Sequence, residues 1–242
     1  MNPYYSDDTV TIYHGDCRDV LPRLSLPAHG IVTDPPYGDT SQPWDRWPDG
    51  WLASTQARQL WCFGSMRMWL SHHAEFSASG FTYSQEVVWE KHNGSGFHAD
   101  RFKRVHELAV HWYRGPWSEV PIAPVKVNEA TARRIHRKRR PHHTGDIGES
   151  HFEAHEGGPK LQRSVIYARS CHGYADHPTQ KPLDILAPLV AYSAETLIVD
   201  PFTGSGSTLI AARAQGRAAI GIELQERYCE IAARRLEGSL PL

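Results

Sequence analysis

Short apolar runs that end in turn-forming or acidic residues recur along the chain and predict the strands of a sheet. These runs span residues 10–13, 30–33, 60–63, 82–89, 108–113, 196–199 and 218–222. Between and after them, apolar residues recur at helical spacing over 183–190, 209–213 and 228–236. Strands that alternate with helices indicate an α/β fold, in which helices cover both faces of a mostly parallel sheet.

This alternation weakens between residues 115 and 175. The stretch contains a basic run at 131–143 and a turn-rich segment at 144–159 with little apolar content. About sixty residues of weak periodicity are too many for an ordinary loop. We therefore expect a main domain formed by residues 1–114 and 176–242, with residues 115–175 inserted as a separate recognition region.

Composition places the chain in a broad class. Of 242 residues, 40% are hydrophobic and 22% charged, which suits a globular protein with a real core. There is no apolar run of the roughly 18–20 residues that a membrane span needs, and the N-terminus lacks the basic and apolar segments of a signal peptide. The four cysteines form no C-x-x-C pair, and the histidines show no H-E-x-x-H spacing. We expect a cytoplasmic protein with no disulfide framework and no metal.

Charge is unevenly distributed along a chain whose net charge is only −1. Residues 1–60 contain eight acidic and four basic side chains, whereas residues 101–140 contain eleven basic and three acidic ones. A solvated basic loop would explain this pattern on its own. A surface that faces a polyanion would also explain it. A second observation is therefore needed before the basic run is assigned to polyanion binding.

The strongest local signal is a glycine-containing turn that follows a buried strand. Asp200 ends the strand, Gly204 and Gly206 lie in the turn, and a helix begins near Ser207. Glycines let the backbone approach a ligand closely, and Glu223 ends the next strand, about where a nucleotide site places its ribose ligand. The motif is not G-x-G-x-x-G, since Leu209 occupies the third position. An acid before the loop repels a pyrophosphate but suits S-adenosylmethionine (SAM), which has a cationic part and a ribose.

A second centre is the turn Asp34-Pro35-Pro36-Tyr37, which follows another apolar run. An exocyclic amine on a nucleobase is a poor nucleophile because its lone pair is delocalised into the ring. The Asp34 carboxylate and the Pro35 carbonyl can accept its two hydrogens, and the Tyr37 ring can stack on the base. Both centres lie at the carboxyl ends of strands in one sheet, where ligands collect. One cleft is thus expected to hold a methyl donor and a flat amine.

Together these motifs resemble a family, the DNA amino-methyltransferases of the circularly permuted kind, in which the catalytic motif precedes the SAM loop. Four segments carry the resemblance: His14-Gly15-Asp16-Cys17, Asp34-Pro35-Pro36-Tyr37, His177-Pro178-Thr179-Gln180-Lys181-Pro182 and Asp200-Pro201-Phe202-Thr203-Gly204-Ser205-Gly206. Thr203 departs from the small or aromatic residue that is frequent there. The resemblance implies a Rossmann-like fold with a seven-stranded sheet and, often, a homodimer.

The resemblance also implies roles for individual residues. The catalytic residues would be Asp34, Pro35, Pro36 and Tyr37. The SAM-binding residues would be Asp16, Cys17, Lys181, Asp200, Phe202, Thr203, Gly204, Ser205, Gly206, Ser207 and Glu223. An aspartate that opens the catalytic turn favours adenine N6 as the methyl acceptor, whereas a serine there favours cytosine N4.

Double-stranded DNA, with the target base flipped out of the helix, is the partner that this reading predicts. The basic run would neutralise phosphates, and polar or aromatic loop residues would contact bases. We expect DNA contacts from Trp44, His92, Asn93, Arg101, Arg133, Arg134, Arg137, Lys138, Arg139 and Arg140. Trp47 is a further stacking candidate, although tryptophan is more often in the core. No nuclease-like segment is visible, so restriction would require a separate endonuclease, and the gene could belong to a bacterium or a phage.

Several alternatives remain open at the sequence level. Cytosine N4 is the nearest, because it too is an amino group on a flat ring, and RNA is a remoter substrate. A glutamine methyltransferase would usually have asparagine at position 34. A regulator that binds SAM or DNA without catalysis would not need Asp34 and Tyr37 intact. A nicotinamide oxidoreductase is disfavoured by Leu209.

Overall fold

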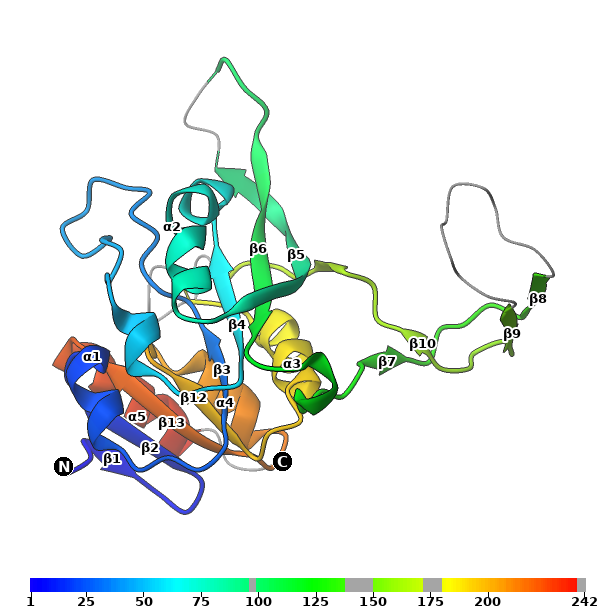
Figure 1. Cartoon of the computed structure of the whole chain (residues 1–242). Coiled ribbons are helices and arrows are strands. Elements are labelled where there is room, and N and C mark those ends of the chain that lie inside the picture. The colour runs from blue at the N-terminus through cyan, green and yellow to red at the C-terminus, as the bar shows by residue number, and fades with distance from the viewer. Residues whose placement is uncertain (96–98, 138–149, 172–179, 239–242) are drawn as a thin grey trace. The chain divides into compact units, whose positions relative to one another are not determined.

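A single large sheet forms the centre of the computed structural model, which describes residues 1–95, 99–137, 150–171 and 180–238 (Figure 1). In spatial order its strands are β1 (Tyr5–Ser6), β2 (Val10–His14), β13 (Ala218–Glu223), β12 (Leu197–Asp200), β3 (Gly30–Thr33), β4 (Gln59–Gly64), β6 (Arg104–Tyr113), β5 (Thr82–Ser95) and β11 (Val165–Tyr167). The five strands from β2 to β4 are parallel, whereas β5 and β6 form an antiparallel hairpin. The carboxyl ends of the parallel strands therefore share one edge.

Helices cover both faces of this sheet. One core packs α3 (Leu183–Tyr192), α4 (Ser207–Arg213) and α5 (Glu226–Gly238) against it. The other packs α1 (Cys17–Val20), α2 (Met66–Ala78) and the 3-10 turns η1 (Leu21–Arg23) and η2 (Trp51–Ser54) against the opposite face. A third 3-10 turn, η3 (Trp117–Glu119), follows β6. In the described part of the chain, no helix has the length and apolar character of a membrane span.

The predicted α/β class is confirmed, and so are all seven predicted strands and the three predicted helices. The sheet has nine strands rather than the expected seven, because two short edge strands extend it. β1 pairs with β2, and β11 pairs with β5. Helix α2 was not predicted. Its buried residues are Met68, Trp69 and Phe76, while Met66 and Leu70 are exposed, so its apolar period is weak.

A second compact unit comprises Pro124–Arg163, and the remainder, Met1–Ala123 with Ser164–Leu242, forms the main unit. The small unit contains the ladders β7 (Lys126–Val127) with β10 (Lys160–Leu161) and β8 (Arg133–Arg137) with β9 (Ser150–Ala154). It lies within the insert 115–175 expected from the sequence. Residues 165–167 belong to the main sheet as β11, because they pair with β5.

Candidate active site

The two predicted centres lie at the ends of neighbouring strands. β12 and β3 are parallel and hydrogen-bonded, with Ile198 opposite Gly30 and Val199 opposite Ile31. The turn that starts at Asp34 and the loop that starts at Asp200 consequently leave the sheet at the same edge. A direct contact joins them, since the Thr33 hydroxyl donates a 2.6 Å hydrogen bond to Oδ1 of Asp200.

One cavity opens at this edge and reaches both centres. Its lining residues are Asp34, Gln180, Lys181, Leu186, Asp200, Phe202, Thr203, Gly204, Ser205, Ser207 and Thr208. The expectation that the catalytic turn and the glycine loop face one cleft agrees with this geometry.

The glycine loop has the backbone conformation that its sequence suggests. Gly204 and Gly206 have φ angles of 50° and 82°, in the left-handed region that favours glycine. A Cβ at position 206 would lie 3.0 Å from Cβ of Ala232 on α5, so this glycine also allows the loop to approach the helix. Glu223 holds the loop from the next strand, because its carboxylate accepts a 2.8 Å hydrogen bond from the Gly204 amide.

Asp200 is a buried acid without a cation. It is 2% exposed, and no ion pair to it occurs among the described residues. Burial raises the pKa of Asp200 to about 6, although hydrogen bonds from Thr33, Thr208 and the Phe202 amide oppose the shift. Burial also raises the pKa of Glu223. Carboxylates desolvated in this way are stabilised by a ligand that brings positive charge and hydroxyl donors, and SAM brings both.

Asp34 is surrounded by donors. The Tyr37 hydroxyl donates a 2.5 Å hydrogen bond to Oδ1, and the Lys181 ammonium contacts Oδ2. Burial raises the pKa of the Asp34 carboxyl, and Glu107 adds to this, while Lys181 and Tyr37 oppose it. Burial likewise raises the pKa of Tyr37 well above its ordinary value, so Tyr37 is a neutral donor. Pro35 is buried beside them and Pro36 is half-buried.

Sequence reasoning assigned Lys181 to SAM, but the structure places its ammonium against Asp34. Lys181 is 7% exposed, and its Nζ also lies 3.4 Å from Oε2 of Glu107. Glu107, on β6, was not predicted as a site residue, and neither was its second partner, Lys91. An acid directly before the mainly apolar run 108–113 was the one signal in the sequence that could have identified it.

The other expected SAM ligands lie one strand further along the sheet. Asp16 follows β2, caps α1 through the Arg18 amide and pairs with the Arg18 guanidinium. Cys17 is buried and does not line the cavity. Gly15 donates its amide hydrogen to the Glu223 carbonyl, 2.9 Å away, so this strand end is linked through Glu223 to the glycine loop. All four cysteines are free thiols.

Of the DNA contacts expected in the main unit, Trp44 and Arg101 are exposed. Trp44 is 45% exposed, whereas Trp47 is buried and stacks on His72 with ring centroids 4.4 Å apart. The Arg101 guanidinium pairs with Asp100. His92 and Asn93 accept hydrogen bonds from Ser170, His92 from its amide and Asn93 from its hydroxyl.

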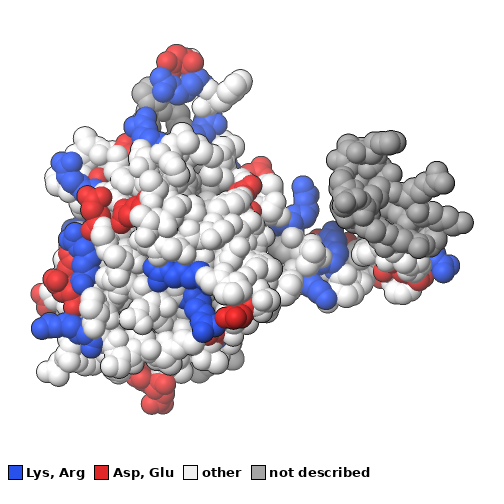
Figure 2. Space-filling view, in the orientation of Figure 1, with Lys and Arg blue, Asp and Glu red and all other residues white. Residues whose placement is uncertain are grey.

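The basic run lies in the small unit. Arg133 and Arg134 are exposed on β8, which continues to Arg137. Lys138, Arg139 and Arg140 lie outside the described residues. On the face of the main unit seen in Figure 2, Lys and Arg are mixed with Asp and Glu. The described charges on that face therefore form no single basic surface.

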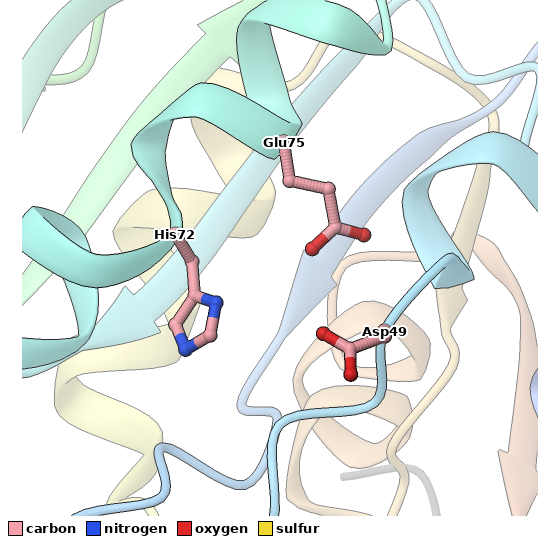
Figure 3. Close-up of side chains that lie close together, drawn as sticks. All are labelled: Asp49, His72 and Glu75. Atoms are coloured by element: carbon pink, nitrogen blue, oxygen red, sulfur yellow. The ribbon is translucent and has the colours of Figure 1, made fainter.

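Among the described residues, one group has the composition of a metal site. Possible ligand atoms of Asp49, His72 and Glu75 lie within 4.8 Å of one another, and the side chains point toward a common space (Figure 3). Both Glu75 oxygens already accept hydrogen bonds, from Trp47 Nε1 at 2.6 Å and from the Gly50 amide at 2.9 Å. We interpret this group as a support for the loop that follows the catalytic turn.

Comparison with known proteins identifies the family. The family model N6_N4_Mtase, described as DNA methylase, matches residues 28–234, most of the chain. The chain therefore belongs to this family of SAM-dependent DNA amino-methyltransferases. A relative over nearly the full length is the type II methyltransferase M.ScaI of Streptomyces caespitosus, with 26% identity across 97% of this chain and 84% of the relative.

Solved structures share the fold. M1.HpyAVI in complex with SAM is 22% identical, with a TM-score of 0.61 over 93% of this chain and 99% of the other. The cytosine-N4-specific PvuII DNA methyltransferase is 13% identical, with a TM-score of 0.65 over 96% of this chain and 88% of the other. The nature of the target base does not follow from these likenesses.

Proposed function

We propose that this DNA methyltransferase transfers the SAM methyl group to the N6 amino group of an adenine that has been flipped out of the duplex. The observation that carries the proposal is the shared cavity, which is lined by Asp34 and by the glycine loop. One cavity that reaches both centres supports direct transfer to the amine, with no covalent intermediate on the protein.

Residues in and around the cavity have separate tasks in this proposal. When bound, SAM supplies an electrophilic methyl group on a sulfonium. Asp200 would balance its positive charge, Glu223 and the Gly204 backbone would hold its ribose, and Phe202 would contact its adenine. Asp34 and the Pro35 carbonyl accept the hydrogens of the base amine and stabilise the positive charge that grows on nitrogen. The extra proton then leaves the methylated amine, with Asp34 as its nearest acceptor. Tyr37 stacks on the base.

Adenine is preferred because Asp34 opens the catalytic turn, a feature that the family resemblance associates with N6. Cytosine N4 is the second candidate, since its amine presents the same two hydrogens. We propose that residues 115–175 form the target-recognition region, with Arg133 and Arg134 on phosphates, and that Trp44, His92, Asn93 and Arg101 contribute from the main unit. From the family resemblance we also propose that the protein forms a homodimer and that a separate chain supplies any restriction endonuclease.

The test is transfer of labelled methyl from SAM to unmethylated duplex DNA. Removing an acceptor that stabilises transition-state charge typically costs about 100- to 1,000-fold in kcat, so we expect that loss for Asp34→Ala. Its SAM affinity, measured by calorimetry, should change little. Equal incorporation by the wild type and Asp34→Ala would show that Asp34 is not the catalytic residue.

A further inference from the structure

Glu107 is a half-buried acid at the same edge of the sheet as the catalytic turn. β6 runs antiparallel to β4, with Leu108 opposite Gly64, so Glu107 lies at the carboxyl end of β4. Its side chain is 14% exposed, and its Oε1 pairs with Lys91. Among the described residues, Oε2 has no hydrogen-bond partner, although Lys181 Nζ lies 3.4 Å away.

Lys181 is thus shared between two carboxylates. Its ammonium contacts Asp34 directly and lies just beyond hydrogen-bond distance from Glu107. Aromatic rings enclose it, with centroids 5.1 Å away for Phe63, 5.8 Å for Tyr37 and 5.9 Å for Trp89. Enclosed in this way, a desolvated ammonium is stabilised by the carboxylates beside it.

This arrangement leaves a conflict at Asp34. Oδ1 accepts from Tyr37 and Oδ2 from Lys181, so both oxygens have donors before a base enters. Each carboxylate oxygen keeps a further lone pair, but the Lys181 ammonium neutralises the charge that would stabilise an incoming amine, so Lys181 and the amine compete for Asp34. Lys181 has another acceptor within reach, because shortening its distance to Oε2 of Glu107 by about 0.6 Å completes a normal charge-assisted hydrogen bond.

We propose that Lys181 passes from Asp34 to Glu107 when the target base enters, and that Glu107 is therefore a positioning residue for the reaction. This inference rests on the proposed function, since it concerns how Asp34 becomes available to an amine. Glu107 acts by receiving Lys181 and does not touch the base.

The transfer of Lys181 from Asp34 to Glu107 can be measured because it changes the charge around Asp34. Asp34 is faced by Lys181, by Glu107 on β6, by Tyr37 from its own turn, by Asp200 at the end of β12 and by Cys62 on β4. Of these, only Lys181 is a cation. Burial raises the pKa of the Glu107 carboxyl, but the positive charges of Lys181 and Lys91 outweigh this and lower it to about 2. Glu107 is thus ionised and can receive the ammonium whenever Asp34 gives it up.

The test compares Glu107→Gln with Glu90→Gln, a matched change of an exposed acid on the neighbouring strand β5. Without the Glu107 charge, Lys181 stays on Asp34 and competes with the amine. We expect kcat to fall roughly 10- to 100-fold, the scale on which small misplacements act. The KM for DNA, the SAM affinity and the melting temperature should stay close to those of Glu90→Gln.

The pH profile of kcat separates this role from a purely structural one. Activity requires ionised Asp34, so it is lost as pH falls through the Asp34 pKa. Glu107 raises that pKa and Lys181 lowers it. The acid limb should therefore move to lower pH in Glu107→Gln and to higher pH in Lys181→Met. At a pH well above the acid limb, the double variant should be no slower than Lys181→Met alone, because Glu107 positions Asp34 only through Lys181.

Three results would overturn the inference while the proposed function stands: Glu107→Gln matching Glu90→Gln, acid limbs that move in the same direction, or a double variant whose losses multiply. If Glu107→Gln does not fold, Glu107→Asp replaces it, and an unchanged kcat there would contradict the inference. Failure of the proposed function looks different, because the wild type itself would then show no Asp34-dependent methylation of a base amine.

Discussion

The two compact units of this methyltransferase are built in opposite ways. The main unit buries Lys181 and Asp200, and half-buries Asp34, at the edge of a nine-stranded sheet with a core on each face. In the described part of Pro124–Arg163, two-stranded ladders dominate and Ala130 is the one buried apolar residue. A two-stranded ladder gains little stability by itself. Substitutions in the small unit should thus alter binding and leave the fold of the main unit intact.

The largest effect among the following variants should come from Glu223→Ala. Glu223 holds the Gly204 amide and, in our proposal, the ribose of SAM, and a hydrogen bond to a charged group contributes about 1.5–3 kcal/mol. We expect SAM affinity by calorimetry to fall roughly 10- to 100-fold. Glu226→Ala, at the start of α5, is the control and should bind SAM normally. Equal affinities for the two variants would remove Glu223 from the SAM site.

Asp200→Asn tests the cost of a buried acid. In the folded chain the pKa of Asp200 is about 6, above its ordinary value of 3.8, so the folded state binds a proton more tightly than the unfolded state. The wild type accordingly loses stability as pH rises from 4 to 6, by about 1–3 kcal/mol. The variant lacks this loss, so its stability relative to the wild type should rise over that interval.

Denaturant unfolding of both proteins at pH 4, 5, 6 and 7 measures the difference. A stability difference that stays flat with pH would show that Asp200 titrates as an ordinary carboxyl. The same variant should bind SAM more weakly, because an amide cannot balance a positive charge. Stability gained and affinity lost together would identify Asp200 as a residue kept for its ligand.

Charge reversal in the small unit should change DNA binding and nothing else. Arg133→Glu with Arg134→Glu should weaken DNA binding about tenfold at moderate salt and reduce the slope of log affinity against log salt by about 2. SAM affinity and melting temperature should not change. Arg234→Glu, at an exposed position on α5, is the control for a general charge effect. Unchanged salt slopes would place the DNA contacts elsewhere.

Much of the main unit could be predicted because its chemistry follows strand ends. Asp34 and Asp200 each close a short apolar run, and parallel strands bring such ends to one edge. Gly204 and Gly206 were recognisable because only glycine readily adopts their backbone angles. These signals are local, and each lies within a few residues.

The rest depends on pairings between distant segments. Glu107 meets Lys181 because the hairpin of β5 and β6 pairs antiparallel with β4, a register that no short motif specifies. Lys181 was assigned to SAM by resemblance alone, and its contact with Asp34 spans 147 positions of the chain. The cap at Ser65 and the sparse apolar period of α2 were too weak to predict that helix.

The central claim is that the methyl acceptor is an exocyclic amino nitrogen of a DNA base. Mass spectrometry of nucleosides, after digestion of duplex DNA treated with the enzyme and labelled SAM, tests it directly. Our account predicts label in N6-methyladenine, and label in N4-methylcytosine would keep the mechanism with the second candidate base. Label in 5-methylcytosine, where a carbon is the acceptor, or no labelled nucleoside at all would contradict it.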